Sequence, residues 1–280
     1  MLGKSVVTQI RLLANQKGAI FTFYSLLALC LMNFINNVQA FQGYDLIEMY
    51  HPMKMLLLSY NRIYYNADAT LFLIQLYPFL LVCPAGFSIL LEQQTKRETL
   101  VISRTNSSVF YFSKVIASFI VTSMVFILPF LVEMVLTCVS FPLGASGDFM
   151  NMGNYSVEYI ESVHNYLFWP FFVKAPYLYV FFCIILFGMV TGLLGTVVVV
   201  FTTLINVKYK VLLFVPIYVL LNATLYMEKF FPGLSTNWYN YLLIFHDETK
   251  NLGYYLISLL ICILFIICGT LYSSKREKIR

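Results

Sequence analysis

Residues 175–205 read APYLYVFFCIILFGMVTGLLGTVVVVFTTLI, a run of 31 positions without a charge. A helix needs about 20 mostly apolar residues to cross the hydrocarbon core of a bilayer. Two more uncharged runs, Thr70–Leu91 and Leu252–Tyr272, contain 22 and 21 residues. Only 11% of the chain is charged, against about 25% of a soluble domain. The sequence therefore predicts a protein that crosses the membrane several times, and it excludes a soluble enzyme.

The hydrophobic segments on both sides of this run predict an all-α polytopic membrane protein with six transmembrane helices. Residues 1–280 then form one transmembrane domain, and the even number of spans leaves both termini on one side. The expected spans are residues 18–38, 70–91, 114–141, 175–205, 211–227 and 252–272.

The start of the chain has two interpretations. A basic lead, an apolar run and Val38-Gln39-Ala40 have the layout of a secretory signal peptide and its cleavage site. The apolar run is longer than the core of a typical signal peptide. We therefore interpret residues 18–38 as a retained first span.

The lysines and arginines predict the orientation, because basic loops stay on the cytoplasmic side. Thirteen of the 18 basic residues fall before the first span, between spans 2 and 3, between spans 4 and 5, and after the last span. Both termini are therefore expected in the cytoplasm of a bacterial cell, with residues 141–174 as an outer loop of a plasma-membrane protein. The net charge of +5 reflects these inner segments, and no nucleic-acid partner is expected.

The outer segments contain apolar and aromatic stretches too short to cross. Residues 154–172 and 46–65 are expected to lie on the membrane surface, where aromatic rings prefer to sit. Residues 228–251 are expected to insert partially or to form an interfacial hairpin.

The chain offers little catalytic chemistry. Its three histidines, His51, His164 and His246, lie in three different outer segments without a fixed-register metal motif, so no metal is expected. The six cysteines lie in apolar runs and are expected to be packed thiols. The chain contains no G-x-x-x-x-G-K-[ST] sequence, so any ATPase that drives it is expected to be another chain.

Two features within the spans are candidates for specific roles. Glu133 lies in the third span, where an ionisable group costs about 2.5–3.5 kcal/mol near the bilayer centre. It either lines a substrate pathway or reaches interfacial water at the outer end. On the fourth span Gly188, Gly192 and Gly195 form small-residue pairs typical of close helix packing, either within the subunit or at a dimer seam.

The segment between spans 2 and 3 carries a family resemblance. It begins with Glu92, continues through Glu98-Thr99-Leu100 and Ser103-Arg104, and returns at Lys114. This order resembles the membrane subunit of ATP-binding-cassette exporters, the ABC-2 permease family. In that family an acid ends the second span, a Glu-Gly-Thr-Leu-like element and a Ser/Thr-Arg turn follow, and a Lys opens the third span. Here Arg97-Glu98 stands before Thr99, without the glycine.

The resemblance implies a cytoplasmic coupling segment over residues 92–113 that docks on a cytosolic ABC ATPase. The residues implied in coupling are Glu92, Arg97, Glu98, Thr99, Leu100 and Arg104. It also implies that residues 1–17 form a connecting helix along the inner surface. The sequence agrees, because Val6, Ile10 and Leu13 repeat at helical spacing beside basic residues suited to lipid headgroups.

We therefore expect a permease subunit of an ATP-driven exporter. It would pair with a second permease subunit, identical or different, and with ATPase chains that bind the ATP and Mg²⁺; this chain is expected to hold no cofactor. The expected cargo is an amphipathic peptide, lipid or drug-like compound. One alternative is an ion-coupled transporter or channel that uses Glu133. Another, an intramembrane enzyme, is disfavoured by the missing nucleophile and ligand sets.

Overall fold

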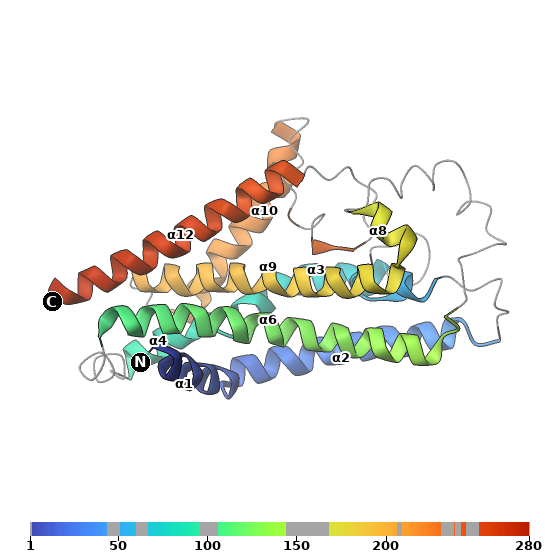
Figure 1. Cartoon of the computed structure of the whole chain (residues 1–280), viewed down its shortest axis with the longest axis horizontal. Helices are drawn as coiled ribbons and strands as arrows, with labels where there is room; N and C mark the ends of the chain where they lie inside the picture. Colours follow the sequence, from blue (N-terminus) through green and yellow to red (C-terminus); the bar gives the residue numbers. More distant parts are fainter. Residues whose placement is uncertain are drawn as a thin grey trace.

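The computed structural model is helical wherever it describes the chain, with turns between the helices and no strand among those residues (Figure 1). The described residues are 2–43, 51–59, 67–95, 106–143, 168–205, 209–230, 238, 242–244 and 252–279. The helices in chain order are α1 (Leu2–Ala14), α2 (Lys17–Ala40), η1 (Pro52–Met55), α3 (Ala67–Val82), α4 (Gly86–Gln94), α6 (Ser107–Ser140), α8 (Trp169–Lys174), α9 (Pro176–Leu204), η3 (Lys210–Leu213), α10 (Phe214–Phe230) and α12 (Leu252–Ile279).

Five helical segments of the described chain are long and apolar enough to cross a membrane. They are Lys17–Ala40, Leu73–Glu92, Ser107–Ser140, Pro176–Leu204 and Tyr255–Lys275. These segments match five of the expected spans and confirm the all-helical, multi-pass class. The remaining expected span, residues 211–227, includes the shorter apolar stretch Val211–Asn222, which covers the end of η3 and the first half of α10.

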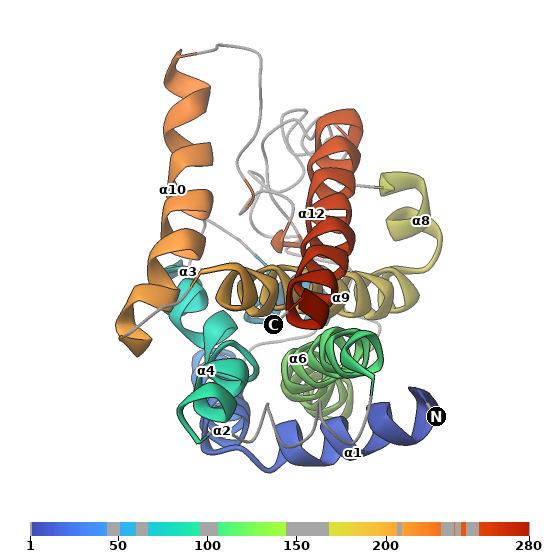
Figure 2. The ribbon, with the colours of Figure 1, turned by 90° about the vertical axis from the view of Figure 1, so that its left-hand side faces the viewer.

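The spans lie side by side along the long axis of the molecule (Figure 1). Helices α2, α6, α9 and the α3–α4 pair run roughly along this axis, whereas α10 and α12 tilt away from it. Both ends of the described chain lie at the same end of the bundle, which we call the terminal end. Viewed toward that end, α1 crosses beneath the ends of α2 and α6 (Figure 2).

Prolines affect the spans unequally. At Cys83-Pro84-Ala85 the second span turns, and α3 ends at Val82 before α4 begins at Gly86. Pro78 and Pro129, in contrast, sit inside the continuous helices α3 and α6. A proline removes one helical hydrogen bond and clashes with the preceding turn, but neighbouring helices in a membrane bundle compensate.

Helices α6 and α9 approach closely along the three glycines of α9. A Cβ added at Gly188 or Gly192 would collide with Ile127 or Ser123 of α6, and one at Gly195 would lie 3.0 Å from Thr122 Cγ2. Small residues let two helix backbones approach and gain dispersion contacts that lipid does not supply. Of the two roles left open by the sequence, the structure gives these glycines packing within the subunit.

Residues 51–59 differ from the expected surface-lying segment. Seven of the nine positions in HPMKMLLLS are buried, and Met53, Leu57 and Ser59 are fully enclosed. Leu56, Leu57 and Leu58 join the main apolar core with residues of α6 and α9. The amide of Ile244 also donates to the carbonyl of Leu58 at 3.0 Å. This segment is therefore packed inside the bundle, because its apolar run is covered by helices that the sequence alone does not locate.

Candidate functional site

A buried ion pair joins two spans at the terminal end. Lys114 Nζ of α6 lies 2.6 Å from Glu92 Oε1 in the last turn of α4, and the two side chains are 1% and 17% exposed. Lys114 also donates to Gln9 Oε1 of α1 at 3.3 Å. We call these three residues the Glu92–Lys114 cluster. A buried ammonium is expensive unless it is paired and hydrogen-bonded, and here it has both kinds of partner.

The cluster connects α1, α4 and α6. A second contact lies beside it, where Ser5 Oγ of α1 donates to Ser113 Oγ at 2.9 Å. On the same helix Leu13 is fully buried and packs with Ala117 and Val121 of α6. Thus α1 is attached to α6 by both polar and apolar contacts.

The cluster lies where the chain leaves α4 toward the segment expected to couple to an ATPase. Glu92 is described, and its partner Lys114 is the lysine expected at the start of the third span. The other implied coupling residues lie outside the described residues: Arg97, Glu98, Thr99, Leu100 and Arg104. Their role remains a prediction.

Glu133 forms a second polar site toward the other end of α6. Its Oε1 accepts from Asn33 Nδ2 at 2.7 Å and from the amide of Leu57 at 2.9 Å. The residue is only 2% exposed. Glu133 is therefore enclosed by α2 and residues 51–59, rather than reaching interfacial water.

Asparagines of α2 complete the attachment of residues 51–59. Asn33 and Asn37 each donate through Nδ2 to the carbonyl of Met55, at 2.9 and 2.8 Å. Sequence reasoning missed both residues. Their signal is a spacing of four positions, which places two amides on one face of an otherwise apolar helix. We call Asn33, Asn37, Met55, Leu57 and Glu133 the Glu133 cluster.

Only one oxygen of Glu133 has a defined role. Oε2 is buried without a hydrogen-bond partner among the described residues. Intramembrane acids are costly and are commonly functional. The geometry gives Glu133 a role in holding residues 51–59.

His51 begins the same buried segment. Its Nδ1 accepts from the amide of Met53 at 3.2 Å, which caps η1, and its ring packs against Phe172 and Tyr177. Burial, reinforced by the nearby charge of Lys54, lowers the pKa of His51 to about 4. His51 is therefore neutral at physiological pH and acts as a structural acceptor.

Within the described ranges no group of three or more His, Cys, Asp or Glu residues is arranged to hold a metal ion. His164 and His246 lie outside those ranges. All six cysteines are free, and three of them, Cys30, Cys83 and Cys262, are buried. The two polar clusters connect helices through side chains of α1, α2, α4 and α6.

Comparison of the chain with known protein families, with curated proteins and with solved structures finds no match in any of the three.

Proposed function

We propose that this chain is the membrane-spanning subunit of an ATP-driven exporter of the ABC-2 permease type. It pairs with a second permease subunit and with cytosolic ATPase chains, which bind ATP and Mg²⁺. Movement of the ATPases is transmitted through residues 92–113, and the bundle alternates its access between the two sides of the plasma membrane. An amphipathic peptide, lipid or drug-like compound is the cargo.

The observation that carries this proposal is the Glu92–Lys114 cluster. A segment that transmits force to a bundle needs a rigid connection to more than one helix. Glu92 is the first residue of the proposed coupling segment, and through Lys114 and Gln9 it is joined to α6 and α1. A displacement of residues 96–105 is then passed to α6 and α1 as well as to α4.

The proposal includes α10 as a sixth span. Helix α9 ends, and α12 also ends, at the terminal end, so the chain between them must return to the opposite end. Helix α10 begins near the end of α9 and runs steeply across the long axis, with a smaller component toward the opposite end (Figures 1 and 2). Its 17 residues cover roughly 25 Å at 1.5 Å per residue, against about 30 Å of hydrocarbon, and η3 precedes it directly. Six crossings would leave both termini on one side, and the basic inner segments favour the cytoplasm as that side.

A second candidate function rests on Glu133. An ion-coupled transporter or channel would use its buried carboxylate, and Oε2 has no partner among the described residues. The exporter is favoured because Oε1 already accepts two hydrogen bonds that hold residues 51–59. The coupled-ion function predicts transport that persists without ATP and follows an ion gradient.

The test is a pair of charge reversals in the coupling segment, Arg97→Glu with Arg104→Glu. A matched control reverses two basic residues at the end of the chain, Lys278→Glu with Arg280→Glu. Membrane insertion should survive in both variants, since most inner basic residues remain. The first variant should lose co-purification with a Walker-motif ATPase and ATP-dependent export, whereas the control should retain both.

Two results would overturn the proposal. Normal ATPase association and export by the Arg97→Glu/Arg104→Glu variant would remove the coupling assignment. Export from ATP-depleted vesicles driven by a proton or sodium gradient, abolished by Glu133→Gln, would establish the ion-coupled function instead.

A further inference from the structure

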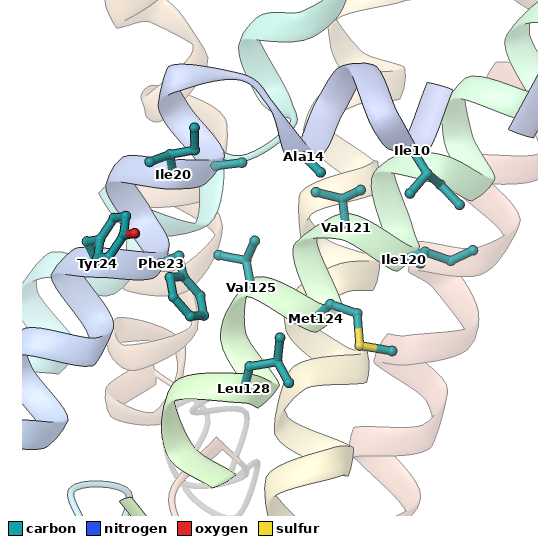
Figure 3. Close-up of a pocket in the computed structure, with 11 residues that line it drawn as sticks. Ile10, Ala14, Ile20, Phe23, Tyr24, Ile120, Val121, Met124, Val125 and Leu128 are labelled. Carbon is teal, nitrogen blue, oxygen red and sulfur yellow. The ribbon is translucent and has the colours of Figure 1, made fainter. Parts of the chain in front are cut away.

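A groove lies between α1, α2 and α6, in the angle made where α1 crosses the other two helices (Figure 3). Its volume is about 400 Å³, within the range of about 300–1,000 Å³ typical of small-molecule sites. Ile10 and Ala14 of α1 close one end, and α2 and α6 supply the walls. Three helices therefore border the groove, which is open on its outer side.

The lining is apolar along its length. Ile20 and Tyr24 of α2 remain 45% and 63% exposed, and Met124 and Leu128 of α6 remain 50% and 45% exposed. Figure 3 shows Tyr24 of α2 and Met124 and Leu128 of α6 on the two sides of the groove, below Ala14. The tyrosine hydroxyl is the one side-chain polar group among the lining residues. Such a surface favours a hydrocarbon ligand.

The charge beside the groove selects the kind of hydrocarbon. Arg11, one residue after Ile10, and Lys17, at the start of α2, are both exposed. Residues 2–40 contain these cations and Lys4 but no aspartate or glutamate. Basic groups at a membrane surface attract anionic headgroups. A ligand with an apolar chain and an anionic head thus complements both the groove and its margin.

We propose that the groove binds one acyl chain of an anionic phospholipid of the bilayer, with its phosphate against Arg11 and Lys17. The bound lipid fixes the angle between α1 and α2, and with it the position of Gln9 in the Glu92–Lys114 cluster. This inference requires only that the chain lies in a bilayer, so it stands or falls separately from the proposed exporter function.

The size of the groove argues against a helix of a second copy as its occupant. A helix with its side chains is about 10–12 Å across, much wider than a single methylene chain. A narrow methylene chain can lie along the groove.

The test uses native mass spectrometry of the purified full chain in detergent. Dioleoylphosphatidylglycerol and dioleoylphosphatidylcholine are titrated separately, because they share acyl chains and differ in headgroup charge. The wild-type chain should retain the anionic lipid preferentially. Arg11→Gln with Lys17→Gln should weaken phosphatidylglycerol binding by about 25-fold, since each cation contributes about fivefold, and should leave phosphatidylcholine binding unchanged.

A second variant fills the groove. Ala14→Phe should reduce the binding of both lipids, whereas Val135→Phe, at an exposed α6 position outside the lining, should bind them as the wild type does. Equal lipid binding by Ala14→Phe and wild type would overturn the proposal. The proposal would also be overturned if the Ala14→Phe chain no longer formed a dimer that the wild type forms but still bound lipid. That result would show that the groove is occupied by a second copy of the chain. If Ala14→Phe fails to fold, the charge variant decides alone, and an unchanged lipid preference overturns the proposal.

Discussion

Lys114 Nζ lies 2.6 Å from Glu92 Oε1, and this contact joins the start of α6 to the last turn of α4. The two partners are not equally buried, since the lysine side chain is 1% exposed and the glutamate side chain 17%. Removing either partner leaves the other with an uncompensated charge. The loss of stability that results depends on how far the remaining charged group is exposed to water.

Glu92→Gln should therefore destabilise the protein more than Lys114→Gln. The first change removes the carboxylate from a fully buried ammonium. It should lower the free energy of unfolding by about 3 kcal/mol, the lower end of the range for breaking a buried ion pair. The second leaves the charge on the less buried of the two side chains, which is 17% exposed, although Oε2 of Glu92 itself is buried. The measurement is the thermal unfolding midpoint in detergent.

The double variant Glu92→Gln/Lys114→Gln should recover part of this loss, because neither charge remains. Lys275→Gln, an exposed lysine of α12, is the matched control and should leave the midpoint unchanged. Equal midpoints for the two single variants and the control would show that the ion pair does not hold α4 to α6.

Glu133→Gln and Glu133→Leu should behave differently. Glutamine keeps a carbonyl oxygen for Asn33 and the Leu57 amide, whereas leucine leaves both buried donors unsatisfied, at about 1–3 kcal/mol each. Residues 51–59 should then separate from α2 and α6 in the leucine variant alone. Ser59 is fully buried. A cysteine substituted at this position should therefore react with an impermeant maleimide only in the leucine variant.

The same pair of variants tests the route of transport. If Glu133 lines the substrate pathway, Glu133→Gln should fold normally and still alter export. Wild-type export by the glutamine variant would limit Glu133 to its structural role and remove the ion-coupled alternative.

Gly192→Ala should weaken the contact between α6 and α9. The new Cβ would collide with Ser123 Oγ and would also lie 2.9 Å from the backbone carbonyl of Phe119, which cannot rotate away. Overpacking of this kind costs about 1–3 kcal/mol. Gly3→Ala is the control, because a Cβ at Gly3 meets nothing within 4 Å. An unfolding midpoint that is equal in the two variants would contradict the close crossing.

The protein should lose stability as the pH falls from about 6.5 to about 4. His51 has a folded-state pKa of about 4 against an ordinary value of 6.5, so its neutral form contributes stability above pH 6.5. Acidification protonates the unfolded chain first and removes that contribution. Protonation of Nδ1 also removes the acceptor for the Met53 amide.

The check is the unfolding midpoint of wild type and His51→Phe at several pH values through this window. Phenylalanine keeps the ring contacts with Phe172 and Tyr177 but does not titrate. The wild-type midpoint should fall more steeply than that of the variant. If the midpoints of wild type and variant fell in parallel with pH, the acid sensitivity would come from titratable groups other than His51.

Single cysteines in a cysteine-free chain should report the proposed topology. Thr95 and Asn106 are exposed at the terminal end, and Gln42 and Leu143 are exposed at the other end. An impermeant reagent added to intact cells should label cysteines at Gln42 and Leu143 only. Ser107 is less suitable, because it is buried and donates to the carbonyl of Ser274. Labelling of a cysteine at Thr95 or Asn106 from outside would show that the orientation in the membrane is the opposite of the proposed one.

The sequence by itself determined the class of fold and most of the spans. Uncharged runs such as residues 175–205 have no stable position in water, and only helices satisfy their own backbone hydrogen bonds in lipid. The glycine spacing of Gly188, Gly192 and Gly195 likewise predicted close packing. The amphipathic repeat before residue 17 predicted α1, because helical periodicity is a local property of the chain.

The tertiary structure decided which residues meet. Glu92 and Lys114 are 22 positions apart, and Asn33 and Glu133 are 100 apart, so no local pattern specifies either contact. The choice between α6 and a second subunit as partner for Gly192 likewise depended on the position of α6. The burial of residues 51–59 was missed for the same reason, since an apolar loop next to a membrane can lie in the lipid interface or between helices. Only the arrangement of α2, α6 and α9 around it determines which of these two environments it occupies.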